Sequence, residues 1–94
     1  MNEKKINSEV LERVFEIIKS RHSEDPDISY TAKLFSEGRS KIACKLVEEA
    51  TETIVAALHE GEDKVISESS DLLFHLLVLW ADLDIEPARV WKEL

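Results

Sequence analysis

Cysteine, glycine and proline are scarce in this chain of 94 residues, which has one cysteine, two glycines and two prolines. The single cysteine, Cys44, excludes an internal disulfide, and together with three scattered histidines it provides no zinc-ligand spacing. We interpret Cys44 as a small buried hydrophobic residue, with a reactive thiol as the less favoured alternative. No uninterrupted apolar run approaches the roughly 20 residues that a membrane-spanning helix requires, so membrane insertion is excluded.

The N-terminus also lacks the pattern of a secretory signal. The charged residues of MNEKKINSEV are not followed by an apolar stretch and a small-residue cleavage site. Basic residues are outnumbered by acidic ones, 12 against 20, which gives a net charge of −8. This balance argues against a surface built for nucleic acid and favours cations as partners. We therefore expect a cytoplasmic protein that binds neither nucleic acid nor membrane.

The length predicts a single domain over residues 1–94, with a core small enough for association between copies to add useful burial. Glycine and proline separate stretches in which apolar residues recur at helical spacing. We therefore expect an all-α fold, a small bundle of four to five helices. The predicted helices run from a cap at Asn7 or Ser8 to about Arg21, from Tyr30 to Ser36, from a cap at Ser40 to Gly61, from Glu62 to about Leu83, and over a short last segment with Pro87 in its first turn.

The two long helices are expected to lie antiparallel and to form the core, because only a tight connection near Gly61 separates them. Residues 72–81, LLFHLLVLWA, are apolar at nine of ten positions. Such a composition is typical of a helix that is buried on every side. Because a chain this short has too few helices to cover every direction, we expect the remaining apolar side to face a second copy, in a homodimer or higher oligomer.

Acidic side chains recur at matching positions of the two long helices. Glu49 and Glu52 on the first, and Glu68 and Asp71 on the second, form i, i+3 pairs that share a helix face. In an antiparallel arrangement the two pairs can face each other. Like charges about 4 Å apart repel by on the order of 4 kcal/mol at a partly shielded dielectric. A hard divalent cation such as Mg²⁺, which prefers oxygen ligands, would remove that repulsion.

A solvated acidic face is the alternative interpretation, with Lys45–Glu49 and Lys64–Glu68 as ordinary i, i+4 ion pairs. Two observations favour a site. Asp71 directly precedes the apolar segment and therefore lies at the edge of a buried region. No lysine or arginine occurs between Lys45 and Lys64, so Glu52 has little local compensation.

Positive charge is concentrated in one stretch of thirteen residues with a single acid, Glu37. This stretch contains Lys33, Arg39, Lys41 and Lys45. Lysines beside a carboxylate cluster suit a polyphosphate substrate, because they bind its outer phosphates while a metal polarises the anhydride. The alternative is that these cations only keep the protein in solution.

His75 follows Asp71 by one helical turn, within the apolar segment. A histidine on an apolar helix is more often buried and hydrogen-bonded than catalytic, so we leave His75 outside the site. A contact that orients the Asp71 carboxylate is the intermediate possibility. Phe74, Trp80 and Trp91 are interpreted as core or interface aromatics.

The order Glu48-Glu49-x-x-Glu52, fifteen residues, then Glu68-x-x-Asp71 resembles the EExxE…ExxD signature of the MazG-like all-α nucleotide pyrophosphohydrolases. The longer context is more telling. The segments SYTAKLF (29–35), KIACKLVEEATETIVAA (41–57) and ESSDLLFHLLVLW (68–80) resemble the phosphoribosyl-ATP pyrophosphohydrolase family. The resemblance covers roughly residues 10–94.

This resemblance implies Mg²⁺-dependent hydrolysis of phosphoribosyl-ATP to phosphoribosyl-AMP and pyrophosphate, in histidine biosynthesis, by a helical bundle that dimerises. It also implies roles for individual residues. The metal ligands would be Glu49, Glu52, Glu68 and Asp71. The catalytic residues would be Glu48 and Glu49, and Glu48 would orient a ligand or water. The substrate phosphates would be bound by Lys41 and Lys45, with Lys33 and Arg39 as weaker candidates.

Two other functions remain open at this point. The same chemistry could act on another nucleotide, and the SYTAKLF segment favours the histidine-pathway substrate because it belongs to the narrower resemblance. A helical dimerisation module without enzymatic activity, its acidic faces merely solvated, is the more distant alternative. In many organisms the activity is fused to a zinc-dependent cyclohydrolase domain, for which 94 residues leave no room, so we expect the stand-alone form.

Overall fold

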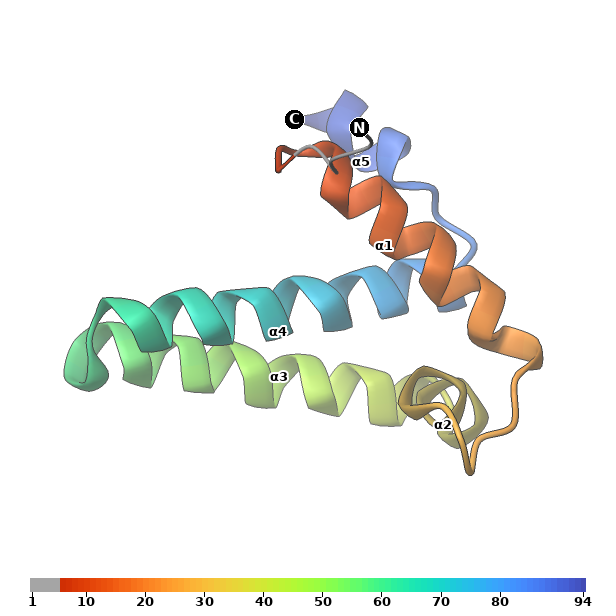
Figure 1. The fold of residues 1–94 in the computed structure, drawn as a ribbon, viewed down its shortest axis with the longest axis horizontal. Helices are drawn as coiled ribbons and strands as arrows, with labels where there is room; N and C mark the ends of the chain where they lie inside the picture. Colours follow the sequence, from red (N-terminus) through yellow and green to blue (C-terminus); the bar gives the residue numbers. More distant parts are fainter. Residues whose placement is uncertain (1–5) are drawn as a thin grey trace, which may run out of the picture.

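The computed structural model describes residues 6–94, which form five α-helices (Figure 1). These are α1 (Glu9–Ser20), α2 (Tyr30–Glu37), α3 (Arg39–Val55), α4 (Glu62–Asp82) and α5 (Pro87–Glu93). The predicted all-α class is thereby confirmed. No helix among these described residues has both the length and the apolarity to span a membrane. Residues 1–5, which belong to the segment predicted to lack a secretory signal, lie outside the described residues.

Polar side chains start the first two helices. The Asn7 side-chain oxygen accepts a hydrogen bond from the backbone N–H of Glu9 at 2.9 Å, whereas the Ser8 side chain makes no capping bond. Of the two predicted caps, Asn7 is therefore the one that satisfies a backbone donor at the start of α1. Ser29 does the same for α2, because its Oγ accepts from the N–H of Ala32 at 3.1 Å.

Two glycines set the directions of the long helices. Gly38 and Gly61 have φ values of 96° and 101°, a region that side chains with a Cβ rarely adopt. Gly38 ends α2 and serves as the N-cap of α3, so the predicted cap at Ser40 is wrong: α3 already begins at Arg39, and Ser40 lies inside its first turn. Gly61 follows a π-helical turn, η2 (Ala56–Glu60), and donates its N–H to the Ala56 carbonyl at 3.1 Å.

Helices α3 and α4 lie side by side and antiparallel, as predicted, while α1 crosses the C-terminal half of α4 and α2 packs at the start of α3 (Figure 1). The core lies where these four helices meet, and its residues are Phe15, Ile18, Leu34, Ile42, Leu77, Val78 and Ala81. Toward Gly61 the α3–α4 pair has no third helix against it within the described chain, and Ile54, Leu58 and Ile66 are exposed there.

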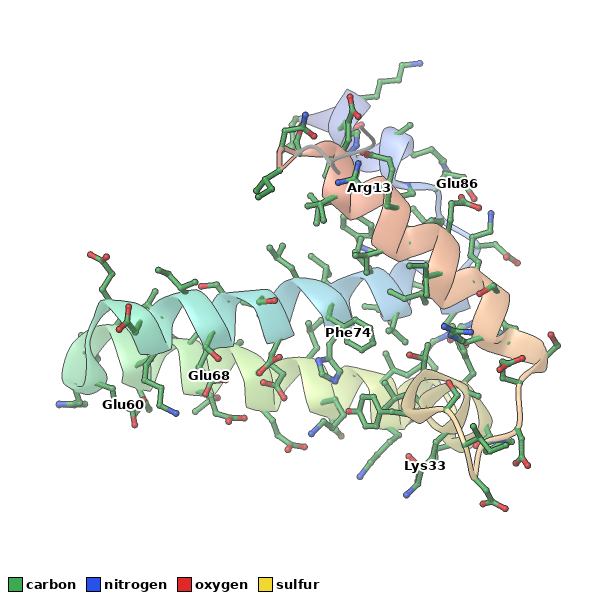
Figure 2. The ribbon with its side chains drawn as sticks, in the orientation of Figure 1. Arg13, Lys33, Glu60, Glu68, Phe74 and Glu86 are labelled. Carbon is green, nitrogen blue, oxygen red and sulfur yellow. The ribbon has the colours of Figure 1, made fainter. Side chains whose placement is uncertain are left out.

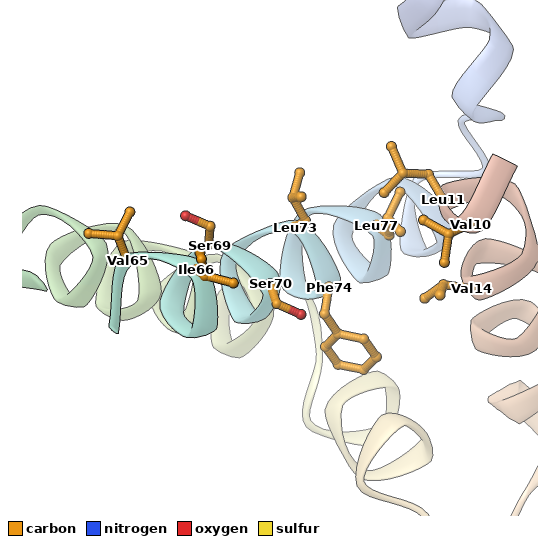
Figure 3. Close-up of a pocket in the computed structure, with 10 residues that line it drawn as sticks. All are labelled: Val10, Leu11, Val14, Val65, Ile66, Ser69, Ser70, Leu73, Phe74 and Leu77. Atoms are coloured by element: carbon orange, nitrogen blue, oxygen red, sulfur yellow. The ribbon is translucent and has the colours of Figure 1, made fainter. Parts of the chain in front are cut away.

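An apolar groove of about 480 Å³ runs between α1 and α4 (Figure 3). Its walls include Val10, Val14, Val65, Ile66, Leu73 and Leu77, and we refer to it below as the apolar groove. Residues 72–81 are therefore not buried on every side within one chain, since Leu73 is 45% exposed on this groove. The expectation that a second copy covers this side stays a prediction.

The interpretation of Cys44 as a buried residue is wrong, because its side chain is exposed. Ile42 and Glu49, both buried, mark the face of α3 that packs on the rest of the chain. Cys44 follows Ile42 by two residues, which is a rotation of about 200° around a helix of 3.6 residues per turn. Its thiol therefore lies on the opposite, outward face of α3.

Candidate active site

Three carboxylates from the two long helices converge in one cluster. Glu49 on α3 and Glu68 and Asp71 on α4 each offer an oxygen, and these three oxygens lie within 4.8 Å of one another. We call these three residues the acidic trio. Glu49 is buried, with 7% of its surface exposed, whereas Glu68 is half-buried and Asp71 is exposed. The cluster therefore opens to solvent on one side, and Figure 2 shows Glu68 on the side of α4 that faces α3.

The hairpin geometry explains why these residues meet. Glu49 and Asp71 are both eleven residues from Glu60, at the turn of the hairpin, and Glu52 and Glu68 are both eight residues from it. Antiparallel helices that start from one turn bring residues at equal distances to the same level, because both rise about 1.5 Å per residue. The i, i+3 spacing then places each pair on a single face. The sequence-based prediction that the pairs face each other is confirmed for the acidic trio.

Glu52, the fourth predicted ligand, is not part of the acidic trio but lies next to it. Glu52 and Glu68 line a shared hollow of about 310 Å³, together with Thr51 and Lys64. Partial burial, followed by the negative charges of Glu52, Asp71 and Glu49, raises the pKa of the Glu68 carboxyl above its usual value of 4.5. Among these charges, that of Glu52 raises the pKa of Glu68 the most, so the Glu52 carboxylate contributes to the negative potential at the cluster.

Cations do not neutralise the α4 side of the cluster. Within residues 6–94, no ammonium or guanidinium nitrogen lies within 4.0 Å of a Glu68 or Asp71 carboxylate oxygen. The Lys64–Glu68 ion pair of the solvated-face interpretation is thus not formed, and Lys64 only lowers the pKa of Glu68 from longer range. The uncompensated charge is what a bound cation would offset.

Lys45 is the one predicted phosphate-binding residue that reaches the cluster. Its Nζ lies 3.8 Å from a Glu49 oxygen and 3.5 Å from a Glu48 oxygen. Partial desolvation acts to lower the pKa of Lys45, but the charges of Tyr30, Glu48 and Glu49 outweigh it and raise the pKa above its usual value. Lys45 therefore keeps a positive charge beside the acidic trio, at the edge where Glu48 is exposed.

The other predicted cations lie farther away. Arg39 begins α3 ten residues before Glu49, about 15 Å along the helix axis. Its Nε donates to a carboxylate oxygen of Asp82 at 2.7 Å, a contact that ties the start of α3 to the end of α4. Lys41 is exposed on α3, and Lys33 is exposed on α2 beside a hollow of about 500 Å³ that Tyr30 also lines.

Sequence reasoning missed one residue beside the cluster and misjudged the contact of another. The prediction that His75 is buried and hydrogen-bonded is confirmed, since only 5% of its surface is exposed. Its Nδ1 lies 2.7 Å from the backbone carbonyl oxygen of Asp71, so the contact with Asp71 does not involve the carboxylate. Its Nε2 lies 2.9 Å from the Tyr30 hydroxyl, which no sequence pattern indicated. The i, i+4 spacing of Asp71 and His75 was the available signal.

The acidic trio fits a small divalent cation. In an octahedral Mg²⁺ site with oxygens at about 2.1 Å, neighbouring oxygens are about 3.0 Å apart and opposite oxygens about 4.2 Å apart, so the oxygens of the trio, which lie within 4.8 Å of one another, would need to approach by up to about 1.8 Å. Carboxylate oxygens are also the ligands this ion prefers, and three of them leave coordination positions for water or phosphate oxygens. Glu68 and Asp71 are not fully buried, so their side chains have room to rotate toward Glu49.

Comparison with known proteins gives a consistent family assignment. The family model described as phosphoribosyl-ATP pyrophosphohydrolase matches residues 11–94. A phosphoribosyl-ATP pyrophosphatase of Paramagnetospirillum magneticum is 60% identical over 94% of this chain and 81% of its own length. Proteins of the same name from Azospirillum brasilense and Pyrobaculum calidifontis are 50% and 51% identical, over 100% and 90% of this chain and 85% and 90% of their own lengths. Because the chain is similar to these proteins over nearly its whole length and carries the acidic trio on its α3–α4 hairpin, it belongs to the phosphoribosyl-ATP pyrophosphohydrolase family.

Proposed function

We propose that this chain hydrolyses phosphoribosyl-ATP to phosphoribosyl-AMP and pyrophosphate, a step of histidine biosynthesis. Identity of 50 to 60% to phosphoribosyl-ATP pyrophosphatases over almost the entire chain supports this activity. The observation that carries it in the structure is the acidic trio, whose oxygens lie within 4.8 Å of one another on the α3–α4 hairpin. A phosphoanhydride is highly charged, and its hydrolysis needs a place where a divalent cation and water can be held.

Glu49, Glu68 and Asp71 would hold a Mg²⁺ ion, and Glu52 would complete the anionic wall around it. Such an ion supplies Lewis-acid polarisation of phosphoanhydride oxygens and lowers the pKa of a bound water. Burial fixes the Glu49 carboxylate within the hairpin, whereas Asp71 and Glu68 reach it from the open side. The protein thus provides one rigid and two adjustable ligands.

The reaction breaks the anhydride that joins the α- and β-phosphates. Water adds across this bond: its oxygen joins one of the two phosphorus atoms, the bridging oxygen stays on the other, and the products are phosphoribosyl-AMP and pyrophosphate. Lys45 stands beside Glu49 with its positive charge retained, so we assign it to the phosphates. Lys41, with Lys33 and Arg39 as weaker candidates, would bind outer phosphates. Glu48 is exposed, and one of its carboxylate oxygens lies 3.5 Å from Lys45 Nζ. We assign Glu48 to orienting the water or a ligand.

Pyrophosphate release in the presence of Mg²⁺ tests the substrate. Phosphoribosyl-ATP should be turned over, while ATP and other nucleoside triphosphates at equal concentration should not. Turnover of a triphosphate with no turnover of phosphoribosyl-ATP would keep the site and replace the substrate. No turnover of any compound by the folded protein would leave the non-enzymatic helical module as the better explanation.

We further propose that two copies associate through the apolar groove. One chain of 94 residues buries few large apolar side chains, and leucine, isoleucine and valine side chains stay exposed along α1 and α4. The groove and the exposed residues on either side of it belong to the same surface, so a two-fold axis can match that surface to itself. A second copy would therefore bury both the groove and the exposed apolar residues beside it, and no other kind of partner is needed.

Sedimentation analysis with a matched pair of variants tests this association. Leu73, 45% exposed in the groove, is changed to Glu, and Leu83, 39% exposed beyond the end of α4, is changed to Glu as the control. We expect a dimer for the control and a monomer for Leu73→Glu. A monomeric unmodified chain, or a dimer that survives Leu73→Glu, would refute this interface.

A further inference from the structure

A buried histidine connects α2 to the helix that carries two members of the acidic trio. His75 lies on α4, one turn after Asp71, and its Nδ1 is 2.7 Å from the Asp71 backbone carbonyl oxygen. On the other side of the ring, Nε2 is 2.9 Å from the hydroxyl oxygen of Tyr30, the first residue of α2. Both ring nitrogens are therefore engaged, and their partners are 41 residues apart in the sequence.

The carbonyl fixes the direction of the whole chain of hydrogen bonds. A carbonyl oxygen only accepts, so His75 Nδ1 must carry the hydrogen and donate it. In a neutral imidazole the other nitrogen is then an acceptor, and the Tyr30 hydroxyl donates to it. Tyr30 keeps its oxygen lone pairs free to accept from a neighbour. For the neutral ring, a single tautomer and a single hydroxyl orientation therefore follow from the contact with the Asp71 carbonyl.

Aromatic packing holds the same residues in place. The His75 ring meets Phe74 edge-on at 5.2 Å between ring centroids and Tyr30 edge-on at 5.9 Å, and Tyr30 lies 6.4 Å from Phe74. Edge-to-face contacts at these separations are favourable because of the ring quadrupoles. Tyr30 is nevertheless 52% exposed, so its ring forms part of the protein surface beside the cluster. Although the Tyr30 ring is half exposed, its hydroxyl group is held in one orientation by these ring contacts and by the hydrogen bond to His75.

The Tyr30 hydroxyl also lies within the electrostatic reach of the site. Burial raises the pKa of the Tyr30 phenol above its usual value; Lys45 acts to lower it, and the charges of Glu49 and Glu48 act to raise it further. Three of the charged residues that influence Tyr30, namely Lys45, Glu48 and Glu49, are therefore in or beside the cluster on the α3 side, while the fourth, Glu37, ends α2. Through His75, the same phenol is connected to the α4 side at Asp71.

We propose that Tyr30 and His75 are positioning residues for the acidic trio. The hydrogen bonds from Tyr30 to His75 and from His75 to the Asp71 carbonyl hold the turn of α4 between Asp71 and His75 in register with α2. They thereby set where the Asp71 carboxylate stands relative to Glu49. The inference rests on the proposed function, since it assigns to the trio the role of holding a divalent cation. Outer residues that orient metal ligands typically contribute 10- to 100-fold to metal affinity.

Three variants separate positioning from simple stability. Tyr30→Phe removes the hydroxyl and keeps the ring, and His75→Leu removes both ring nitrogens. Val78→Ala is the control: Val78 is fully buried on α4 three residues beyond His75, so this change weakens the core without touching the hydrogen bonds. The measurement is the dissociation constant for Mn²⁺ without nucleotide, from the electron paramagnetic resonance signal of free Mn²⁺, together with the melting temperature of each variant.

We expect Tyr30→Phe and His75→Leu to weaken Mn²⁺ binding by about tenfold, and Val78→Ala to change it by less than twofold despite a lower melting temperature. Unchanged Mn²⁺ affinity in Tyr30→Phe, with phosphoribosyl-ATP turnover by the unmodified chain intact, would overturn the positioning role and leave the proposed function standing. A weakening that follows the melting temperature in all three variants would overturn it as well. An unmodified chain that binds no Mn²⁺ would overturn both the metal site and its positioning.

Discussion

Removing one carboxylate from the acidic trio should separate the effect of a metal on stability from the effect of charge repulsion. Asp71→Asn is the cleanest such change, because Asp71 is exposed and the amide keeps the shape of the side chain. Without metal, the variant should be at least as stable as the unmodified chain, since one of three mutually repelling charges is gone. With Mg²⁺ present, the unmodified chain should gain more stability than the variant.

The size of this difference in the Mg²⁺ response follows from binding linkage. A free Mg²⁺ concentration ten times the dissociation constant stabilises the folded chain by about 1.4 kcal/mol. For a domain of this length, 1 kcal/mol corresponds to about 4 to 8 °C, so the melting temperature should rise by about 6 to 11 °C. If Asp71→Asn weakens binding about tenfold, through the loss of one anionic ligand, the same Mg²⁺ concentration adds only about 0.4 kcal/mol, or about 2 to 3 °C.

Thermal unfolding followed by circular dichroism, with Mg²⁺ varied at constant ionic strength, measures both effects. Asp84→Asn is the matched control, because Asp84 lies beyond the end of α4 and asparagine tolerates its left-handed backbone, φ 58°. The control should keep the full Mg²⁺ response. Equal responses in Asp71→Asn and the unmodified chain would refute the assignment of Asp71 as a ligand, as would a metal-free Asp71→Asn that is clearly less stable than the control.

Three further changes test other parts of the structure. Just above pH 4.5, the raised pKa lets Glu68 keep a proton in the folded chain that it loses in the unfolded chain. The contribution of Glu68 to the unfolding free energy of the metal-free chain should therefore fall as pH rises. Glu68→Gln should remove that part of the slope in urea titrations, and an unchanged slope would contradict the pKa shift. Gly61→Ala should lower the unfolding free energy by about 1 to 3 kcal/mol in urea, because its φ of 101° strains any residue with a Cβ although no atom lies near enough to clash; a neutral effect would count against this turn. Phe15→Ala should cost about 3 to 5 kcal/mol in the same assay, because Phe15 is only 1% exposed at the centre of the core, and a cost below 1 kcal/mol would contradict that placement.

The acidic trio could be predicted from the sequence because its geometry depends on two local rules. The i, i+3 spacing fixes which side chains share a helix face, and a single glycine turn fixes which levels of the two helices meet. Glu49, Glu68 and Asp71 obey both rules, so the structure brings them together as expected. The same α3 spacing places Lys45 Nζ 3.8 Å from a Glu49 oxygen, an i, i+4 pair that was predicted as part of the solvated-face interpretation and not as part of the site.

The Tyr30–His75 contact could not be predicted in this way. It joins residues 45 positions apart, on helices whose relative placement depends on how the core packs and on the backbone at Gly38. The exposure of Cys44 was missed for a related reason. Composition indicates that cysteines are often buried, but the face of α3 on which Cys44 lies is decided by packing against α4.

The apolar segment of α4 shows the limit of composition in a different way. Nine apolar residues in ten predicted burial on every side, yet Leu73 is 45% exposed in the single chain. The apolar pattern indicates how much of the helix surface must be buried, but it does not indicate whether the same chain or a second copy buries it. Sedimentation of the Leu73→Glu variant decides whether a second copy supplies the rest.

The most direct test of the central claim is single-turnover hydrolysis of phosphoribosyl-ATP at saturating Mg²⁺ by Glu49→Gln, with Glu93→Gln on α5 as the matched control. Glu49 is buried between the long helices, whereas Glu93 is exposed at the far end of the chain. We predict that Glu49→Gln stays folded and that its rate of hydrolysis falls by at least about a hundredfold, because the variant lacks a carboxylate that holds the metal. Glu93→Gln should retain the full rate. A folded Glu49→Gln that hydrolyses phosphoribosyl-ATP as fast as the control would contradict the claim that the acidic trio is the active site.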